Sequence, residues 1–120
     1  MSKTVLTVDD SRTMRDMLLL ALQDAGYTVI QAVDGVDGLE TLAAKGADVV
    51  ITDINMPRMD GFGFIEGLRA DPNHRTTPVL VLTTESDADK KARARAGATG
   101  WIVKPFDPVK LVDAVRRVAA

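Results

Sequence analysis

The sequence contains no cysteine, a single histidine and no long apolar segment. Without cysteine the chain cannot form a disulfide, bind a metal through thiolate or use a cysteine nucleophile. No window approaches the roughly 20 apolar residues that a membrane span requires, so we expect a cytoplasmic protein without membrane insertion. His74 stands among polar residues of a predicted loop, where we expect it to be exposed to solvent.

The charge of the chain is small but unevenly distributed. The formal net charge is −2, whereas a duplex DNA reader is normally far more basic, so we expect no nucleic acid partner. Residues 1–85 carry seven Lys/Arg and thirteen Asp/Glu, whereas residues 86–120 carry eight and four. The basic C-terminal part is either a solvated helix face or a surface for an acidic partner.

Short β-branched runs alternate with segments of helical period along the whole chain, which is typical of repeated strand-helix units. The pattern predicts one domain over residues 1–120, an α/β doubly wound (flavodoxin-like) five-stranded parallel sheet in order 2-1-3-4-5 with five helices. Val49 and Val79 begin continuously apolar runs, as expected of interior strands. The expected strands are 4–8, 28–32, 49–52, 79–82 and 101–103; the expected helices are 12–25, 35–44, 61–70, 88–96 and 108–118.

Polar residues follow the predicted strands directly, at the edge where open parallel sheets bind ligands. Asp9 and Asp10 follow the first strand, Asp53 the third, Thr83 the fourth and Lys104 the fifth. Three carboxylates brought close together repel one another unless a cation neutralises them, and Mg²⁺ prefers such oxygen ligands. Taken singly, the aspartates could instead be helix caps or turn residues, and the lysine could be a surface side chain.

Together these residues predict phosphoryl transfer, whose catalysis consists mostly of positioning and charge neutralisation. Asp53 would be the nucleophile and form an aspartyl phosphate, a mixed anhydride that water hydrolyses. Lys104 would supply a positive charge, and Thr83 would donate a hydroxyl hydrogen bond to the phosphate. A nucleotide-binding module is disfavoured because no complete GxGxxG or GxxxxGKS/T loop follows the first strand.

The chain from residue 3 to residue 118 resembles the receiver domains of two-component response regulators. The resemblance rests on the Asp9-Asp10 pair, on Asp53 within TDINMPRMDG, on Thr83 after an apolar strand and on Lys104-Pro105-Phe106. The segment 97–111, together with the expected absence of an output domain, resembles the single-domain chemotaxis regulators. The resemblance implies phosphorylation of Asp53 by a histidine kinase of the chemotaxis type, with Mg²⁺ as cofactor and no catalysis beyond the protein's own phosphorylation and dephosphorylation.

The same resemblance assigns further residues. It implies that Asn55 lends its backbone carbonyl to the metal, that Asn55 and Glu85 tune dephosphorylation, and that the Lys104-Pro105 peptide is cis. It also implies a switch formed by Thr83 and Trp101, although Trp101 could equally be a packing residue. The expected partner surface, which would bind the flagellar motor switch protein, comprises Lys90, Lys91, Arg93, Trp101 and Lys110.

Other readings remain open at this point. We expect a monomer, whose further partners are a phosphatase or a histidine phosphotransfer protein. Within the family, a phosphorelay intermediate or a phosphate sink would use the same residues as a motor regulator. Outside it, a metal-dependent phosphatase with an aspartyl nucleophile is disfavoured because Asn55 occupies the place where such enzymes carry a second aspartate.

Overall fold

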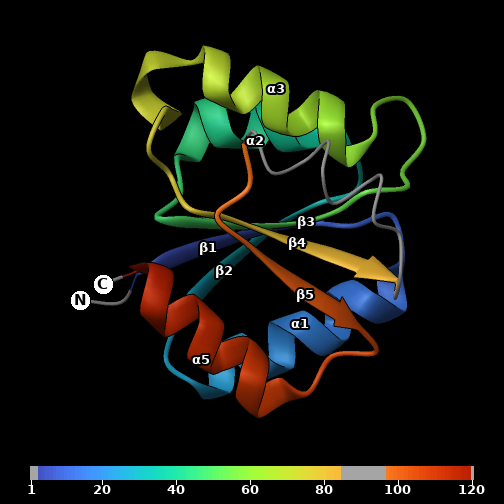
Figure 1. Ribbon diagram of the computed structural model, residues 1–120, viewed down its shortest axis with the longest axis vertical. Helices are drawn as coiled ribbons and strands as arrows, with labels where there is room; N and C mark the ends of the chain where they lie inside the picture. Colours follow the sequence, from blue (N-terminus) through green and yellow to red (C-terminus); the bar gives the residue numbers. More distant parts are fainter. Residues whose placement is uncertain (1–2, 85–96, 120) are drawn as a thin grey trace.

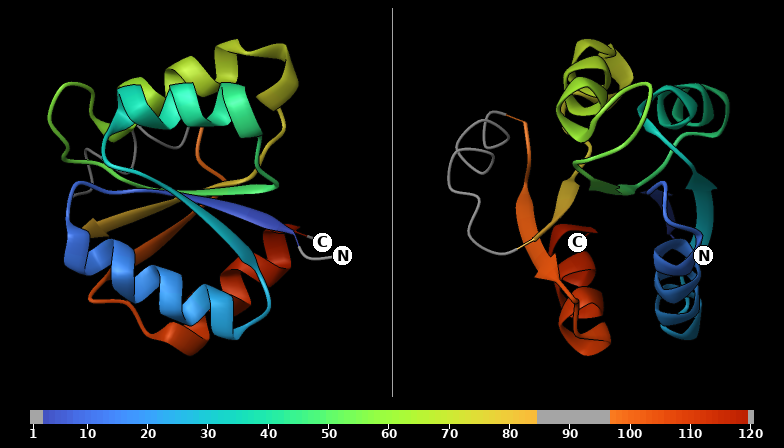
Figure 2. Two further views of the ribbon diagram at one scale, coloured as in Figure 1. Left: turned by 180° about the vertical axis from the view of Figure 1, so that it is seen from behind. Right: turned by 90° about the vertical axis from the view of Figure 1, so that its right-hand side faces the viewer.

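The strands form one parallel sheet that lies between two layers of helices, as Figures 1 and 2 show. This computed structural model describes residues 3–84 and 97–119. Helices α2 and α3 cover one face of the sheet, and α1 and α5 cover the other. The elements are β1 (Thr4–Val8), α1 (Arg12–Asp24), β2 (Thr28–Ala32), α2 (Gly35–Lys45), β3 (Val49–Asp53), α3 (Gly61–Ala70), the short 3₁₀ turn η1 (Pro72–His74), β4 (Val79–Thr84), β5 (Gly100–Lys104) and α5 (Pro108–Ala119).

The strand order is β2-β1-β3-β4-β5, which confirms the predicted doubly wound architecture. The chain passes from β1 outward to β2 and then returns across β1 to β3, so the order reverses at β1 and β3. Such a reversal opens a crevice beyond the carboxyl ends of these two strands. The helix predicted at 88–96 lies outside the described residues.

The two-residue period of the strands divides the core between the faces of the sheet. On one face Val5, Val49 and Ile51 pack with the buried residues of α1 and α5. On the other face Leu6 and Val50 pack with those of α2 and α3. Every residue of β3 is buried, as predicted for an interior strand with helices on both sides.

The helix ends follow the local signals of the sequence. Ser11 caps α1, because its side-chain oxygen accepts a hydrogen bond from the Met14 amide at 3.2 Å. Gly46 ends α2 with a φ of 69°, in the left-handed region that glycine adopts without a steric penalty. Within the described residues no helix combines the length and the apolar composition needed to cross a bilayer.

One sequence-based expectation about an isolated side chain is wrong. His74 is only 8% exposed, because η1 folds back and brings its ring nitrogen Nδ1 to 2.9 Å from the Thr77 hydroxyl oxygen. The guanidinium of Arg69 also donates to the His74 carbonyl at 2.9 Å. The polar residues around His74 suggested a solvated loop, and only the return of the chain to α3 buries the ring.

Candidate functional site

Three charged side chains converge where the strands of the sheet end. Asp9 follows Val5 at two-residue steps along β1, and Asp53 follows Ile51 in the same way along β3, so both point toward the α1 and α5 face. Lys104 is the last residue of β5 and reaches the same place. Carboxylate oxygens of Asp9, Asp10 and Asp53 lie within 4.8 Å of one another. The structure therefore brings together the three aspartates that the sequence analysis selected.

Lys104 is turned into this acidic cluster. Its ammonium nitrogen Nζ lies 3.1 Å from Asp53 Oδ1 and 3.7 Å from Asp9 Oδ2, and its side chain is 20% exposed. A freely solvated surface lysine would not be held between two carboxylates, which excludes that interpretation. One positive charge among three carboxylates still leaves the cluster with excess negative charge.

Asp9 is the fully buried carboxyl group of the cluster. The residue is 0% exposed, and burial raises the pKa of its carboxyl above the ordinary value, with repulsion from Asp53 as a further cause. Its Oδ1 accepts a hydrogen bond from the Ser11 amide at 2.9 Å. Its Oδ2 has no hydrogen-bond partner among the described residues. A buried carboxylate oxygen in this condition is stabilised by an added cation.

The donor set fits a hard divalent cation. The cluster offers carboxylate oxygens from a buried Asp9, an exposed Asp10 and a nearly buried Asp53, and neither a thiolate nor an imidazole belongs to it. Mg²⁺ binds proteins through one or two carboxylates and keeps several waters, so an acidic cluster with one solvent-facing member suits it. Asp9 Oδ2, which is buried without a hydrogen bond and lies 3.7 Å from Lys104 Nζ, is the atom whose position most directly favours such an ion.

Asp53 is oriented by the residue that follows it. The Ile54 amide donates to Asp53 Oδ1 at 2.8 Å, and the Gly61 amide donates to the Ile54 carbonyl at 2.7 Å. Gly61 approaches so closely that a Cβ atom there would lie 2.3 Å from the Asp53 carbonyl oxygen. The start of α3 therefore supports the backbone of Asp53 directly.

Comparison with known proteins assigns the architecture and the acidic cluster to one family. Residues 5–116 match the response regulator receiver domain. The chain belongs to this family. Receiver domains accept phosphoryl groups from histidine kinases, generally act as non-enzymatic signalling modules and typically bind a metal ion at their aspartate cluster.

Two relatives of this receiver are chemotaxis proteins. It is 36% identical over 116 residues to the chemotaxis protein CheY of Pseudomonas aeruginosa, and the match covers 95% of this chain and 94% of that protein. The structure of the chemotaxis protein CheY4 of Vibrio cholerae is 45% identical, with a TM-score of 0.94 over 98% of this chain and 99% of that one. A 38% identical match to the probable transcriptional regulator ycf27 of Guillardia theta covers 95% of this chain but only 44% of that protein.

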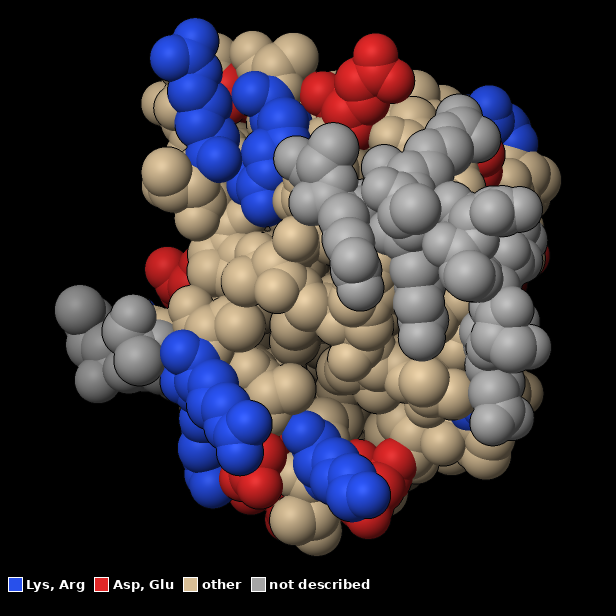
Figure 3. All heavy atoms as spheres, viewed as in Figure 1, with Lys and Arg blue, Asp and Glu red and all other residues tan. Residues whose placement is uncertain are grey.

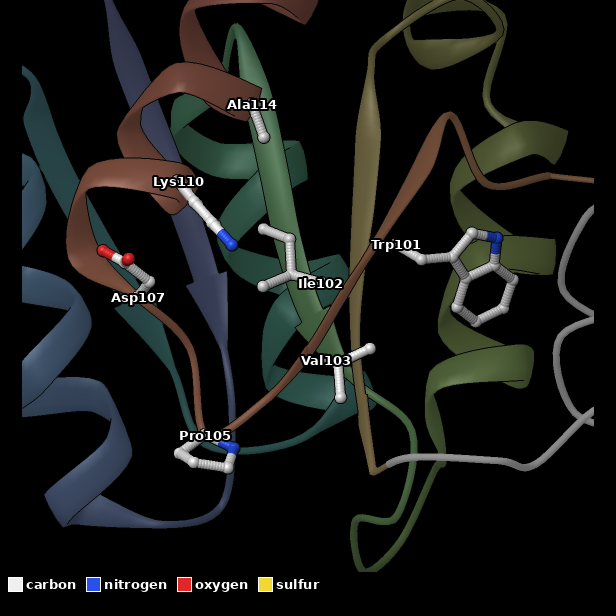
Figure 4. A pocket seen from close by; sticks show the side chains of 7 residues that line it. All are labelled: Trp101, Ile102, Val103, Pro105, Asp107, Lys110 and Ala114. Atoms are coloured by element: carbon white, nitrogen blue, oxygen red, sulfur yellow. The ribbon is translucent and has the colours of Figure 1, made fainter.

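The expected switch residues of the receiver lie on strands β4 and β5. Thr83 is 3% exposed and follows Leu82, the residue that pairs with Asp53 across the sheet. Trp101 pairs with Val81, two residues before Thr83, so the period of the strands directs Thr83 and Trp101 to the same face. Trp101 is half-buried against the core beneath α2 and α3. Figure 4 shows its ring on the opposite side of β5 from Lys110 and Ala114.

The two described residues of the expected partner surface, Trp101 and Lys110, are both among the residues that line a pocket beside β5 and α5. Trp101, Val103, Pro105 and Lys110 are among the residues that line this pocket of about 330 Å³, and Val103 is 42% exposed. Figure 3 shows that Lys and Arg side chains alternate with acidic side chains along the lower edge of the molecule. The remaining predicted residues of the surface and of dephosphorylation tuning, which are Lys90, Lys91, Arg93 and Glu85, lie outside the described residues.

The structure adds contacts that sequence analysis did not find. The Arg15 guanidinium donates from Nη1 to the Asp9 carbonyl at 2.8 Å and so fixes the start of the loop that carries Asp10. Asp34 caps α2 by accepting from the Asp37 amide at 2.8 Å, a role that its place before the helix could have indicated. Its ion pair with Arg58, 24 residues away, has no local signal. The Lys104-Pro105 peptide is cis, as the resemblance implied.

Proposed function

We propose that this receiver is a CheY-like response regulator whose Asp53 accepts a phosphoryl group from a chemotaxis-type histidine kinase in a reaction that requires Mg²⁺. The observation that carries the proposal is the meeting of Asp9, Asp10, Asp53 and Lys104 at one edge of the sheet. The similarity to CheY over nearly the full length of both chains supports the assignment of a CheY-like receiver.

The reaction is an exchange of bonds at phosphorus. A carboxylate oxygen of Asp53 attacks the phosphorus, the bond from phosphorus to the kinase histidine nitrogen breaks, and the imidazole leaves with the electron pair. The cation, held by Asp9, Asp10, Asp53 and the backbone carbonyl of Asn55, would neutralise charge on the phosphoryl oxygens. Lys104 Nζ, already 3.1 Å from Asp53 Oδ1, pairs with the phosphoryl group once it is attached.

Activation would proceed through Thr83. Its hydroxyl turns toward the new phosphoryl oxygens, which changes the space beside Trp101 on the same face of the sheet. The phosphorylated state is favoured only to the extent that the phosphate interacts more strongly with this arrangement than with the resting one. The consequence is a changed surface around β5 and α5, which binds the flagellar motor switch protein and includes Lys110.

The modification is tested with a small phosphodonor. The protein is incubated with acetyl phosphate and Mg²⁺, and the modified residue is located by mass spectrometry after borohydride trapping. We expect one adduct, on Asp53, that is absent without Mg²⁺ and absent from Asp53→Asn. Asp48→Asn is the control, because Asp48 accepts a hydrogen bond from the Thr4 amide at the opposite edge of the sheet. An adduct elsewhere, or none at all, contradicts the proposal.

The output is tested separately from the modification. Phosphorylated protein should bind a peptide from the motor switch more tightly than unphosphorylated protein, and Lys110→Glu should weaken binding without slowing phosphorylation. Arg75→Glu is a suitable control because Arg75 is exposed after η1, away from α5. Rapid transfer of the phosphoryl group to a histidine phosphotransfer protein, without binding of the motor peptide, would identify a phosphorelay intermediate instead. Unchanged amide exchange in β5 and α5 on phosphorylation would contradict the switch.

A further inference from the structure

The loop 54–60, which connects β3 to α3, is tied to the start of α2 by a bidentate ion pair. Arg58 Nε lies 2.7 Å from Asp34 Oδ2, and Arg58 Nη2 lies 3.0 Å from Asp34 Oδ1. Asp34 is 3% exposed and also caps α2 through the Asp37 amide. Two parallel hydrogen bonds to a carboxylate fix both its distance and its orientation. The loop is therefore attached to a rigid helix end rather than to another loop.

A second contact beside the ion pair leaves the loop no room to shift toward α2. The Gly35 amide donates to the Met59 carbonyl at 3.2 Å. A Cβ atom on Gly35 would lie 2.7 Å from Met59 Cγ and 2.8 Å from the Met59 carbonyl oxygen. Glycine is thus needed at this position for the backbone of the loop to approach the helix so closely.

Arg58 adopts an unfavourable backbone conformation in order to make these contacts. Its φ is 64°, in the left-handed region, and it is the one non-glycine residue with positive φ among the described residues. This conformation is uncommon for arginine, because its Cβ crowds the following carbonyl group. Strained residues persist where the surrounding structure holds them, and they gather at functional sites. The strained backbone at Arg58 therefore indicates a function that depends on the contact of its long side chain with Asp34.

The other end of the loop controls Asp53. The Ile54 amide, the first group of the loop, donates to Asp53 Oδ1, and the Ile54 carbonyl accepts from the Gly61 amide. The position of the loop thus determines the orientation of the carboxylate and the place of the Asn55 backbone. Residue 55 lies only three positions from the ion pair, so displacement at Arg58 is transmitted over a short length of chain.

We infer that Asp34 and Arg58 are positioning residues for the metal and phosphoryl-acceptor site, an inference that rests on the proposed function. They hold the loop in the conformation in which Asp53 and the Asn55 carbonyl meet the cation. Neither residue touches the phosphoryl group. Loss of the ion pair should weaken Mg²⁺ binding and slow phosphorylation by a small molecule, because both depend on the same loop position.

Two variants remove the ion pair without damaging the elements that carry it. Arg58→Asn suits the left-handed conformation better than arginine does, and Asp34→Asn retains a side-chain oxygen that can cap α2. We expect each to reduce both the Mg²⁺ affinity, measured by calorimetry, and the rate of phosphorylation by acetyl phosphate by about 10-fold, the lower end of what supporting partners of metal ligands contribute. The double variant should lose little more than either single one, because the two residues act as a unit.

Positioning is measured separately from simple stabilisation. Arg58→Asn relieves backbone strain but removes the ion pair to Asp34, so these two effects on its thermal midpoint oppose each other, and Mg²⁺ affinity and rate are compared at a temperature where both proteins are folded. Asp48→Asn, the same chemical change at the opposite edge of the sheet, should alter neither Mg²⁺ binding nor the rate. If Arg58→Asn and Asp34→Asn both keep the wild-type Mg²⁺ affinity and the wild-type rate of phosphorylation, the inference is overturned, whether or not their stability falls.

A comparison of two phosphodonors shows whether Arg58 positions the site or binds the kinase. If the variants react normally with acetyl phosphate and slowly only with a phosphorylated kinase, Arg58 belongs to a docking surface and the inference is wrong. If the wild type binds Mg²⁺ but forms no adduct on Asp53, the proposed function fails. Weaker Mg²⁺ binding by both variants would in that case still support the role of the ion pair.

Discussion

The contact between Gly61 and the backbone of Asp53 leads to a prediction of stability and reactivity from a single added methyl group. In Gly61→Ala the Cβ would lie 2.3 Å from the Asp53 carbonyl oxygen and 2.9 Å from Ile54 Cα. Both atoms belong to the backbone, so neither can rotate away. An ordinary contact begins at about 3.4 Å, and the start of α3 must therefore move by about 1 Å relative to the end of β3.

The expected free energy follows from two opposing effects. Replacing glycine by alanine near a helix start restricts the unfolded chain and stabilises the fold by about 0.4–1 kcal/mol. Overpacking against atoms that cannot rearrange costs about 1–3 kcal/mol, or more where the backbone must shift. The second effect is larger, so we expect Gly61→Ala to lower the free energy of unfolding by a net amount of about 1–2 kcal/mol.

Gly63→Ala is the matched control on the same helix. Its Cβ would meet Met59 Cγ at 3.0 Å and Asp60 Oδ1 at 3.5 Å, and both are side-chain atoms. The Met59 side chain can rotate, so we expect this variant to be as stable as the wild type or more stable, by up to about 1 kcal/mol. The two substitutions are chemically identical, but Gly61→Ala should lower the free energy of unfolding, whereas Gly63→Ala should leave it unchanged or raise it.

Urea denaturation followed by circular dichroism measures both free energies, and acetyl phosphate labelling measures reactivity. Gly61→Ala should also slow phosphorylation of Asp53 in the protein that remains folded, because the displaced Ile54 amide no longer orients the carboxylate. Gly63→Ala should react at the wild-type rate. If Gly61→Ala matches Gly63→Ala in both measurements, the close approach of α3 to β3 does not support the site and the reasoning is refuted.

Three further predictions concern single polar side chains. The pKa of Asp9 is raised in the folded state, so the folded protein binds this proton more tightly than the unfolded chain does. The free energy of unfolding without metal should therefore fall as pH rises from the ordinary carboxyl pKa through the raised one. Urea titrations with EDTA measure this dependence, and Asp9→Asn should remove much of it. A metal-free stability that rises across this range would contradict the assignment. Thr7→Val should stabilise the protein by about 1 kcal/mol in urea denaturation, because the buried Thr7 hydroxyl has no hydrogen-bond partner among the described residues; a loss of stability would show that the hydroxyl is satisfied. Arg69→Met should lower the free energy of unfolding by about 2–4 kcal/mol, because the Arg69 guanidinium donates to the carbonyls of Gly97, His74 and Thr77. A variant that unfolds in urea like the wild type would show that these hydrogen bonds do not stabilise the fold.

The accuracy of the sequence-based predictions depended on how local their physical basis was. The Ser11 cap and the fully buried β3 were predictable, because capping depends on neighbouring residues and burial of a strand follows from its own composition. Met17 follows Met14 at helical spacing in α1, yet it is 44% exposed. Spacing locates an apolar stripe on a helix but not its edges, which depend on the width of the sheet beneath.

The sequence by itself determined the alternation of strands and helices and the placement of Asp9, Asp53 and Lys104 at strand ends, because chain periodicity and the geometry of parallel sheets leave little choice. Only the tertiary structure decided that Lys104 lies between two carboxylates, that Asp9 Oδ2 is buried without a hydrogen bond and that Arg58 binds Asp34. Such contacts join residues far apart in the sequence. Their distances depend on how the sheet twists and how the helices pack, and no local pattern encodes either.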